Sequence, residues 1–286
     1  MQKLHLGFLY GLIAALASAG TAIFTKLAVS VPTETMVFIR FAICFLLVLP
    51  MCKGKLKFSL ASLPKHFLRD LCGLISIYCY FYAVKNLPLV NATSLTNTTP
   101  LFLPLVILVW SRLVVSKARF WAAGIGFAGV LIMLRPTPDH FFEWASVAGL
   151  GTGLLSAIAF LGIRKLSNTD TTETILFYYF GISTLLSFFP MVYNWHPISA
   201  GKLWIYLLAM GILSMIYQFA TTKSFTHAPP SKVSSMAYLS IFFGGLAGWA
   251  VFDEMPDVWV FVGAALTIVG GILALMDNTP PTKLKS

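Results

Sequence analysis

Long apolar stretches, separated by short polar connections, run through the whole sequence. A helix that crosses a membrane needs about 20 predominantly apolar residues. The stretches that approach or reach this length are 6–27, 34–52, 67–85, 91–114, 119–134, 146–163, 173–192, 203–222, 232–252 and 258–276. A membrane β-barrel would alternate apolar and polar residues, whereas runs such as Leu101–Trp110 are continuously apolar. The pattern predicts an all-α, polytopic membrane protein with ten transmembrane helices.

The composition supports this class. Of the 286 residues, 58% are hydrophobic and 10% are charged, whereas a soluble domain carries about 25% charged residues. A soluble enzyme, a disordered chain and a secreted disulfide scaffold are therefore excluded. The four cysteines lie in or beside apolar runs without metal-ligand spacing, so we interpret them as small apolar residues. We expect no metal and no cofactor.

The second half of the sequence repeats the first. Residues 26–41 recur as 165–180 at an offset of 139, including Thr33-Glu34-Thr35 as Thr172-Glu173-Thr174. This predicts two five-helix repeats, 1–140 and 141–286. A cleaved leader ending near Ala15–Ala19 is an alternative for the first segment. It is disfavoured because segment 146–163 is the counterpart of that helix in the second repeat.

Five helices per repeat is an odd number, so the second repeat enters the membrane from the opposite side. The net charge of +10 tests this expectation, because basic residues concentrate in cytoplasmic loops. With a cytoplasmic N-terminus, fifteen basic residues lie in or beside inner loops and three in outer loops. We therefore predict inverted repeats with both termini cytoplasmic, and the basic excess does not indicate nucleic-acid binding.

Several short motifs resemble a known transporter family. They are Ser18-Ala19-Gly20, Phe24-Thr25-Lys26-Leu27, Phe38-Ile39-Arg40-Phe41, Pro100, Phe252-Asp253-Glu254, Gly263 and Gly270-Gly271. With the inverted repeat, they resemble EamA-type permeases of the drug/metabolite transporter superfamily. The resemblance covers the whole chain. It implies a multi-pass protein of a bacterial inner membrane that acts as a secondary transporter, and binding near the bilayer midplane is typical of such folds.

The fourth segment begins with an unusual density of polar residues. Seven of the ten residues in 91–100 can form hydrogen bonds, and polar side chains at membrane depth mark functional sites. Asn97 and Thr93, at i and i+4, are predicted to line a substrate cavity, and Pro100 is predicted to kink the helix. Hydrogen bonding between packed helices, or a position in the outer interface, would also explain this stretch.

Other intramembrane polar residues are further candidates for substrate contact. Tyr78 and Tyr82 share one face of the third segment, and Ser214 and Gln218 share one face of the eighth; Ser235 lies in the polar start of the ninth. Aromatic faces with a few amides suit a planar or cationic organic ligand. Ordinary packing explains most of the aromatic residues.

The charged groups constrain the mechanism. Arg40, two turns into the second segment, is interpreted equally well as a structural anchor, an outer-gate residue or a carboxylate binder. The acidic residues and histidines are assigned to segment ends, so the sequence shows no buried proton relay. This favours exchange or facilitated transport over tight proton coupling.

A secondary transporter of a small polar metabolite is the preferred function. A membrane-embedded enzyme lacks support because no catalytic motif is present, and a receptor or scaffold subunit would not need the inverted duplication. The resemblance makes S-adenosylmethionine the leading substrate candidate, because 252–257 and 38–41 are similar to that branch of the family. An amino-acid or drug exporter is the alternative. The expected partners are the substrate and the lipid bilayer, with a monomer or weak homodimer as the expected state.

Overall fold

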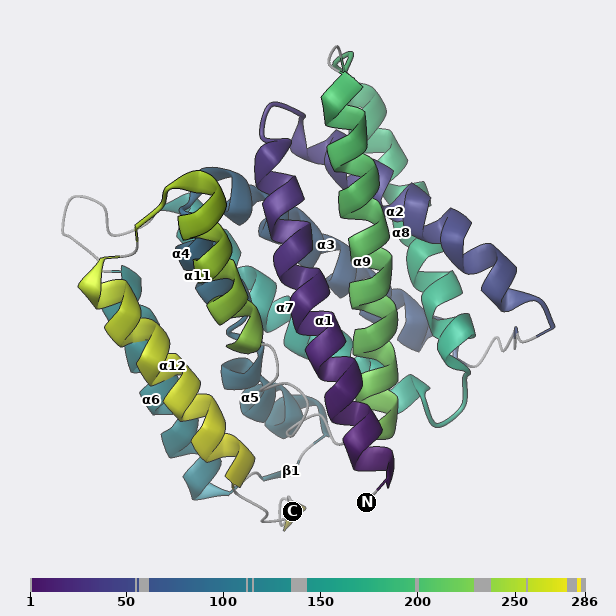
Figure 1. The fold of residues 1–286 in the computed structure, drawn as a ribbon. Helices are drawn as coiled ribbons and strands as arrows, with labels where there is room; N and C mark the ends of the chain where they lie inside the picture. Colours follow the sequence, from purple (N-terminus) through teal and green to yellow (C-terminus); the bar gives the residue numbers. More distant parts are fainter. Residues whose placement is uncertain are drawn as a thin grey trace.

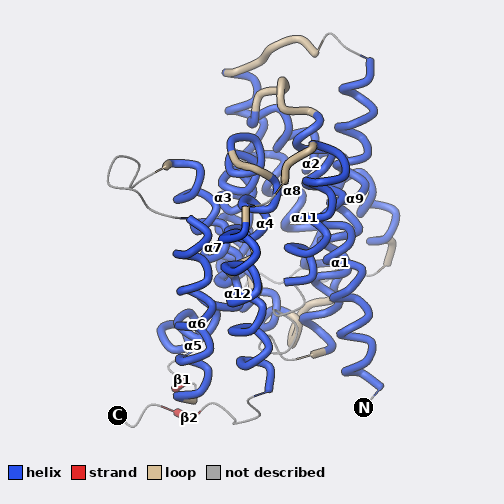
Figure 2. Tube along the Cα trace, turned by 60° about the vertical axis from the view of Figure 1, so that its left-hand side comes forward, coloured by secondary structure: helices blue, strands red, loops and turns tan. Residues whose placement is uncertain are grey.

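The computed structural model is a bundle of helices (Figures 1 and 2). It describes residues 2–54, 56, 62–111, 113–114, 116–134, 143–198, 201–228, 238–255, 257–276 and 282–283. The helices are α1 (Gln2–Leu27), α2 (Thr33–Val48), α3 (Leu63–Asn86), α4 (Leu89–Thr96), α5 (Thr99–Ser111), α6 (Lys117–Leu134), α7 (Trp144–Leu166), α8 (Thr172–Tyr193), α9 (Gly201–His227), α11 (Tyr238–Phe252) and α12 (Val258–Met276). A 3₁₀ turn, η1, spans Leu49–Cys52, and the two-residue strands β1 (Leu113–Val114) and β2 (Thr282–Lys283) pair antiparallel.

The predicted class, an all-α polytopic membrane protein, is confirmed. Seven helical stretches are long and apolar enough to cross a membrane, and three shorter apolar helices cover Phe120–Gly129, Tyr238–Phe252 and Val258–Gly270. These stretches fall in the ten predicted segments. Large apolar side chains such as those of Leu46 and Trp121 point outward, with exposed fractions of 66% and 77%. A surface of this kind suits contact with lipid.

Prolines and one hydroxyl cap set several helix boundaries. Pro32 and Pro88 stand immediately before α2 and α4 with φ near −54°, a value that proline fixes in advance. At the start of α8, the Thr171 hydroxyl accepts a hydrogen bond from the Thr174 N–H at 3.2 Å. This cap satisfies one of the amide donors that a helix leaves unpaired at its start.

The fourth predicted segment is broken into α4 and α5. Helix α4 ends at Thr96, and α5 begins at Thr99, directly before Pro100. A residue before proline avoids the helical conformation, and proline itself has no N–H to continue the ladder. The Thr96 and Thr98 hydroxyls donate to the carbonyls of Ala92 and Leu95 at 2.8 and 2.6 Å. The kink predicted at Pro100 is thus a full interruption two residues earlier.

The helices pair reciprocally between the two halves. Helix α1 packs along α9 and α3 along α7, while α2 faces α8 and α6 faces α12. Figure 1 shows the α1–α9 and α6–α12 pairs side by side. Helix α1 begins and α12 ends at the same end of the bundle (Figure 2), which we call the N-terminal end. The opposite end, where α1 finishes at Leu27, we call the Lys26 end.

Close helix packing depends on glycines at particular contacts. A Cβ on Gly129 of α6 would lie 2.5 Å from the Gly263 carbonyl oxygen of α12, and one on Gly270 would lie 2.6 Å from the Ala122 carbonyl oxygen. On α3, a Cβ on Gly73 would lie 2.8 Å from the Tyr179 ring. These backbones approach closely because no side chain separates them, which is a common device between membrane helices.

Candidate functional site

A cavity lies between the two halves, inside the ring formed by α1, α3, α7 and α9. It holds about 800 Å³ of space not filled by protein atoms, counting its mouth. The lining residues are Gly11, Ala14, Ala15, Ser18, Thr21, Arg40, Ser76, Ile77, Tyr80, Thr96, Asn97, Thr99, Thr152, Ser156, Phe160, Tyr217, Thr221, Ser224, Phe225 and Ser240. Twelve of these twenty carry a hydroxyl group, so hydroxyls recur in a wall whose surface is otherwise mostly apolar. Transporter sites are built in this way at mid-membrane depth.

The described lining covers the middle of α1, slightly nearer the Lys26 end, and the last part of α9, near the N-terminal end. On α1 it extends from Gly11 to Thr21, a rise of about 15 Å at 1.5 Å per residue. On α9, which runs in the opposite direction, it covers Tyr217 to Phe225 near the end of that helix.

Arg40 is the one charged residue among the described lining residues. It lies on α2 with 1% of its surface exposed, and its guanidinium carbon is 5.4 and 5.7 Å from the ring centres of Phe41 and Phe81. Its Nε and Nη1 atoms have no hydrogen-bond partner among the described residues. The other buried arginine, Arg69, donates to the Asp70 carboxylate at 3.0 Å. Arg69 Nε is likewise without a partner among the described residues, but Arg40 differs from Arg69 in lacking a carboxylate contact there.

The break between α4 and α5 contributes to the cavity wall. Thr96, Asn97 and Thr99 line it, and the Asn97 amide donates to the Thr93 carbonyl at 2.8 Å. Thr93 itself is 3% exposed and is absent from the lining. Its hydroxyl donates to the Leu89 carbonyl at 2.8 Å, and a Cβ on Gly244 of α11 would lie 2.6 Å from its oxygen. Of the predicted pair, the structure brings Asn97 to the cavity, whereas Thr93 packs between helices.

The tyrosines that face the cavity differ from those expected. Tyr80 and Tyr217 line it, whereas Tyr78 and Tyr82 do not. Residues two positions apart lie on roughly opposite sides of a helix. Because Tyr80 faces the cavity, Tyr78 and Tyr82 face away from it. Tyr78 packs against the apolar cluster of α2 and α8, and Tyr82 is 43% exposed. Of the three tyrosines, the structure thus brings Tyr80 to the cavity wall and not the expected Tyr78 and Tyr82.

The predicted residues of α9 lie just outside the cavity wall. Ser214 and Gln218 are buried at 0% and 3% exposure but are absent from the lining, where Tyr217 and Thr221 stand instead. The Ser214 hydroxyl has no partner among the described residues. Ser235, the remaining predicted residue, lies outside the described residues.

Sequence reasoning missed the contribution of α7. Thr152 and Ser156 line the cavity opposite Ser76 of α3. The Ser76 and Ser156 hydroxyl oxygens are 2.8 Å apart, and the Thr152 hydroxyl donates to the Ser76 carbonyl at 3.3 Å. Thr152 and Ser156 are four residues apart in an apolar helix, and this spacing of two hydroxyls could have identified them as lining candidates from the sequence. The contacts join the two halves directly beside the cavity.

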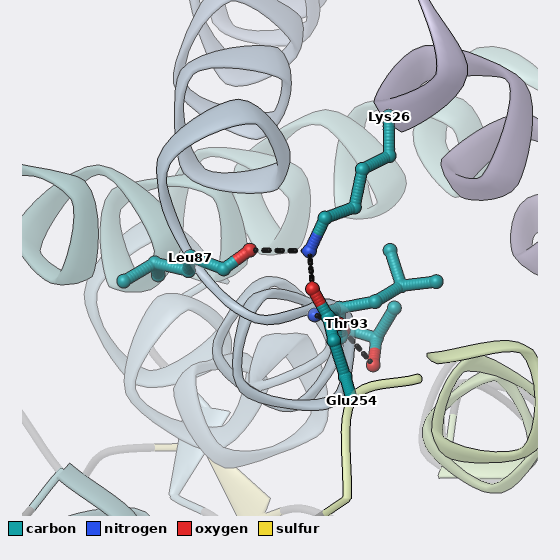
Figure 3. A network of polar contacts seen from close by, with 5 residues as sticks. Lys26, Leu87, Thr93 and Glu254 are labelled. Atoms are coloured by element: carbon teal, nitrogen blue, oxygen red, sulfur yellow. Dashed lines mark hydrogen bonds and ion pairs between the residues drawn. The ribbon is translucent and has the colours of Figure 1, made fainter. Parts of the chain in front are cut away.

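An ion pair closes the structure at the Lys26 end (Figure 3). The Lys26 ammonium group pairs with Glu254 Oε1 and also donates to the Leu87 carbonyl at 3.1 Å. Glu254 Oε2 accepts the Leu89 N–H, the first donor of α4, at 2.7 Å. Asp253 adopts a left-handed φ of 53°, so the chain turns after α11 and Glu254 faces α1 and α4. One carboxylate thus connects α1, the α3–α4 turn and the end of α11.

A second charged cluster is buried where α3 begins and α7 ends. His66 and Asp70 of α3 both have 0% of their surface exposed. His66 Nε2 lies 3.7 Å from Asp170 Oδ2, and the Arg69 guanidinium lies 3.7 Å from the Tyr179 ring centre. The assignment of all acidic residues and histidines to segment ends is therefore wrong for Asp70, whereas His66 lies in the first turn of α3 but is buried there. Helix α3 starts at Leu63, which places Asp70 two turns inside it.

Comparisons with known proteins agree with the architecture. The sequence profile of the EamA-like transporter family matches residues 5–135 and 143–276. The chain is 29% identical to the pseudopaline exporter CntI of Pseudomonas aeruginosa, over 96% of this chain and 95% of that one. It is 27% identical to a riboflavin transporter of Vibrio cholerae, over 92% and 90% of the two chains. A solved crystal structure superposes with a TM-score of 0.70 at 18% identity, covering 94% of this chain and 96% of that one.

These matches confirm the predicted resemblance and the transporter class. The named relatives move small molecules across membranes and are not enzymes. The profile match extends over most of both halves of the sequence. The chain belongs to the EamA-like transporter family.

Proposed function

We propose that this chain is a secondary transporter, an exchanger or a facilitator, which binds a small polar organic metabolite in the cavity between its two halves. The observation that supports it is a cavity lined by hydroxyls and by the Arg40 guanidinium inside an otherwise apolar bundle. Hydrocarbon offers no partner for hydroxyls and a guanidinium, so such groups are retained where a polar ligand meets them. The two halves, 1–140 and 141–286, would move against each other around this site.

The proposed setting is a bacterial inner membrane with both termini in the cytoplasm. In this orientation the N-terminal end faces inward, and the Lys26–Glu254 ion pair closes the outward path. On α9 the cavity lining extends to Phe225, near the N-terminal end, which together with this ion pair supports an inward-facing arrangement of an alternating-access cycle. Exchange or facilitation is preferred over tight proton coupling because no described lining residue is acidic or a histidine. The buried His66 and Asp70 lie outside that lining.

The substrate candidates follow from the cavity chemistry and from the relatives. The resemblance favours S-adenosylmethionine. The relatives named as pseudopaline exporter and riboflavin transporter make pseudopaline and riboflavin direct alternatives. Tyr80, Phe160 and Tyr217 offer aromatic surfaces for a planar ring.

A liposome flux assay tests this function. Purified protein is reconstituted, and uptake of labelled S-adenosylmethionine, riboflavin and a set of amino acids is followed with and without the same compound inside. We expect saturable flux of at least one compound, accelerated by internal substrate. Ser18→Trp, which fills the cavity, should abolish this flux, whereas Leu46→Trp on the lipid-facing side of α2 should not. Equal flux in protein-free liposomes, or collapse of flux with the pH gradient without any dependence on internal substrate, would contradict the proposal.

A further inference from the structure

The cavity wall carries two polar donors that the protein itself leaves unpaired. Arg40 Nε and Nη1 and the Tyr80 hydroxyl are buried and lack a hydrogen-bond partner among the described residues. Both residues line the cavity, and both approach the Phe81 ring: the Arg40 guanidinium carbon lies 5.7 Å and the Tyr80 ring centre 5.4 Å from its centre. Buried polar groups in native proteins are normally hydrogen-bonded. Two unpaired donors next to one cavity therefore indicate a missing acceptor.

Three other cations of the bundle have an ion-pair or hydrogen-bond partner within the protein. Lys26 pairs with Glu254, Arg69 with Asp70, and Arg164 donates to the Thr226 carbonyl at 3.1 Å. Arg40 is at least as buried as these cations, yet its Nε and Nη1 have no hydrogen-bond partner among the described residues, and its guanidinium carbon lies beside the Phe41 and Phe81 rings. A structural anchor would have its donors satisfied by carbonyls or a carboxylate. Of the roles that the sequence left open for Arg40, this favours binding.

The charge of the cavity wall indicates which chemical group of a ligand would pair with the Arg40 and Tyr80 donors. Arg40 is the single charge among the described lining residues, and none of them is acidic. We propose that Arg40 and Tyr80 form an anion subsite which binds a carboxylate group of the transported metabolite. A guanidinium binds a carboxylate through two parallel hydrogen bonds, and the phenol adds a third donor. One cation matches one negative charge, which favours a carboxylate over a dianionic phosphate.

The hydroxyls of the remaining lining residues indicate which hydrogen-bonding groups the rest of this ligand would carry. The hydroxyls of Thr21, Ser224 and Ser240 donate to the backbone carbonyls of Ala17, Gly7 and Ala15 at 2.9, 2.6 and 3.4 Å. Their oxygens can then only accept from a ligand. We infer a substrate with a carboxylate at Arg40 and hydroxyl or amine donors elsewhere. A purely cationic ligand without a carboxylate does not fit.

This inference rests on the proposed transport function, and the test separates the two. Liposomes containing the protein are loaded with a small-molecule extract of bacterial cells, and the released compounds are identified by mass spectrometry. We expect every compound released above the protein-free level to carry a carboxylate. Its primary-amide analogue should be released roughly tenfold to hundredfold more slowly, the range expected for losing a charge-assisted hydrogen-bonded pair. Release of neutral, cationic or solely phosphorylated compounds would overturn the inference, and no release at all would overturn transport itself.

Two variants assign the preference to Arg40. In Arg40→Gln, acid and amide should be released at equal rates, because the charge that separates them is gone. In Asn97→Ala, which removes a neutral polar group from the wall and leaves the guanidinium in place, both rates should fall while their ratio is kept. An undiminished acid preference in Arg40→Gln would refute the assignment. If Arg40→Gln does not fold, as judged by thermal unfolding, the subsite is tested with Tyr80→Phe instead. The ratio of acid release to amide release is then compared between this variant and the unmodified protein. Tyr80→Phe should lower that ratio, and an unchanged ratio would refute the subsite.

Discussion

The Lys26–Glu254 ion pair should control how often the Lys26 end opens. Replacing Glu254 by Ala removes both the ion pair and the acceptor for the Leu89 N–H. Replacing it by Gln keeps an acceptor but removes the charge. The two variants therefore separate the contribution of the charge from that of the cap on α4.

The magnitude follows from the burial of the pair. The side chains of Lys26 and Glu254 are 15% and 25% exposed, so solvent screens the interaction only in part. A hydrogen bond to a charged group contributes about 1.5–3 kcal/mol, and the partial exposure places this pair at the lower end. Losing about 1.5 kcal/mol from the closed state would raise the open population about tenfold. Glu254→Ala should exceed this, because the first amide of α4 also loses its partner.

Labelling of a single cysteine measures the opening. Thr21 is the α1 lining residue nearest the Lys26 end, so Thr21→Cys is introduced after the four native cysteines are replaced. A membrane-impermeant thiol reagent is added on the Lys26 side of oriented vesicles. We expect the labelling rate to rise about tenfold with Glu254→Gln and further with Glu254→Ala.

A double-mutant cycle supplies the control. If Lys26 and Glu254 act as a pair, Lys26→Met combined with Glu254→Gln should add little to either change alone. Rates that multiply independently, or a labelling rate unchanged by Glu254→Ala, would show that the ion pair does not hold this end closed.

Three further predictions concern packing, buried charge and the cavity face. Gly129→Leu should lower the unfolding temperature of the purified protein by forcing apart α6 and α12, at a cost of about 1–3 kcal/mol, whereas Gly124→Ala, where an added Cβ meets nothing within 4 Å, should leave it unchanged or higher; equal effects would refute the close contact. Asp70→Asn should destabilise the protein by about 3–5 kcal/mol because it leaves Arg69 as a buried charge without its carboxylate, and a thermal unfolding curve identical to that of the unmodified protein would contradict this. Tyr80→Phe should weaken substrate binding measured by thermal shift, whereas Tyr82→Phe, on the exposed face of α3, should not, and the reverse order would restore the face expected from the sequence.

The sequence predicted the helices well because each hydrophobic stretch satisfies its own backbone hydrogen bonds locally. A spanning segment must be helical and of nearly fixed length in a bilayer, so composition alone indicates it. A kink at Pro100 could be predicted for the same reason, because the restriction that proline places on the backbone of the preceding residue is local. Asn97 and Arg40 were also found, because a polar group in such a segment is conspicuous.

The faces of the helices could not be predicted in the same way. Tyr78, Tyr80 and Tyr82 are chemically equivalent in the sequence, and the rotation of α3 against α7 selects Tyr80. In a soluble helix the polar side identifies the solvent, but here both lipid and protein interior are apolar, so periodicity carries little information about orientation. Ser214 and Gln218 were displaced from the cavity wall by the same ambiguity.

The sequence by itself determined the all-helical membrane class, the internal repeat and the charge asymmetry, because these depend on local hydrophobicity and on counting. Only the tertiary structure decided which polar groups meet. It placed Lys26 against Glu254 across 228 positions, buried His66 and Asp70, and left buried donors of Arg40 and Tyr80 without a partner among the described residues. The physical reason is that pairing energies depend on distance and burial in space, and neither is encoded in the spacing of residues along a helix.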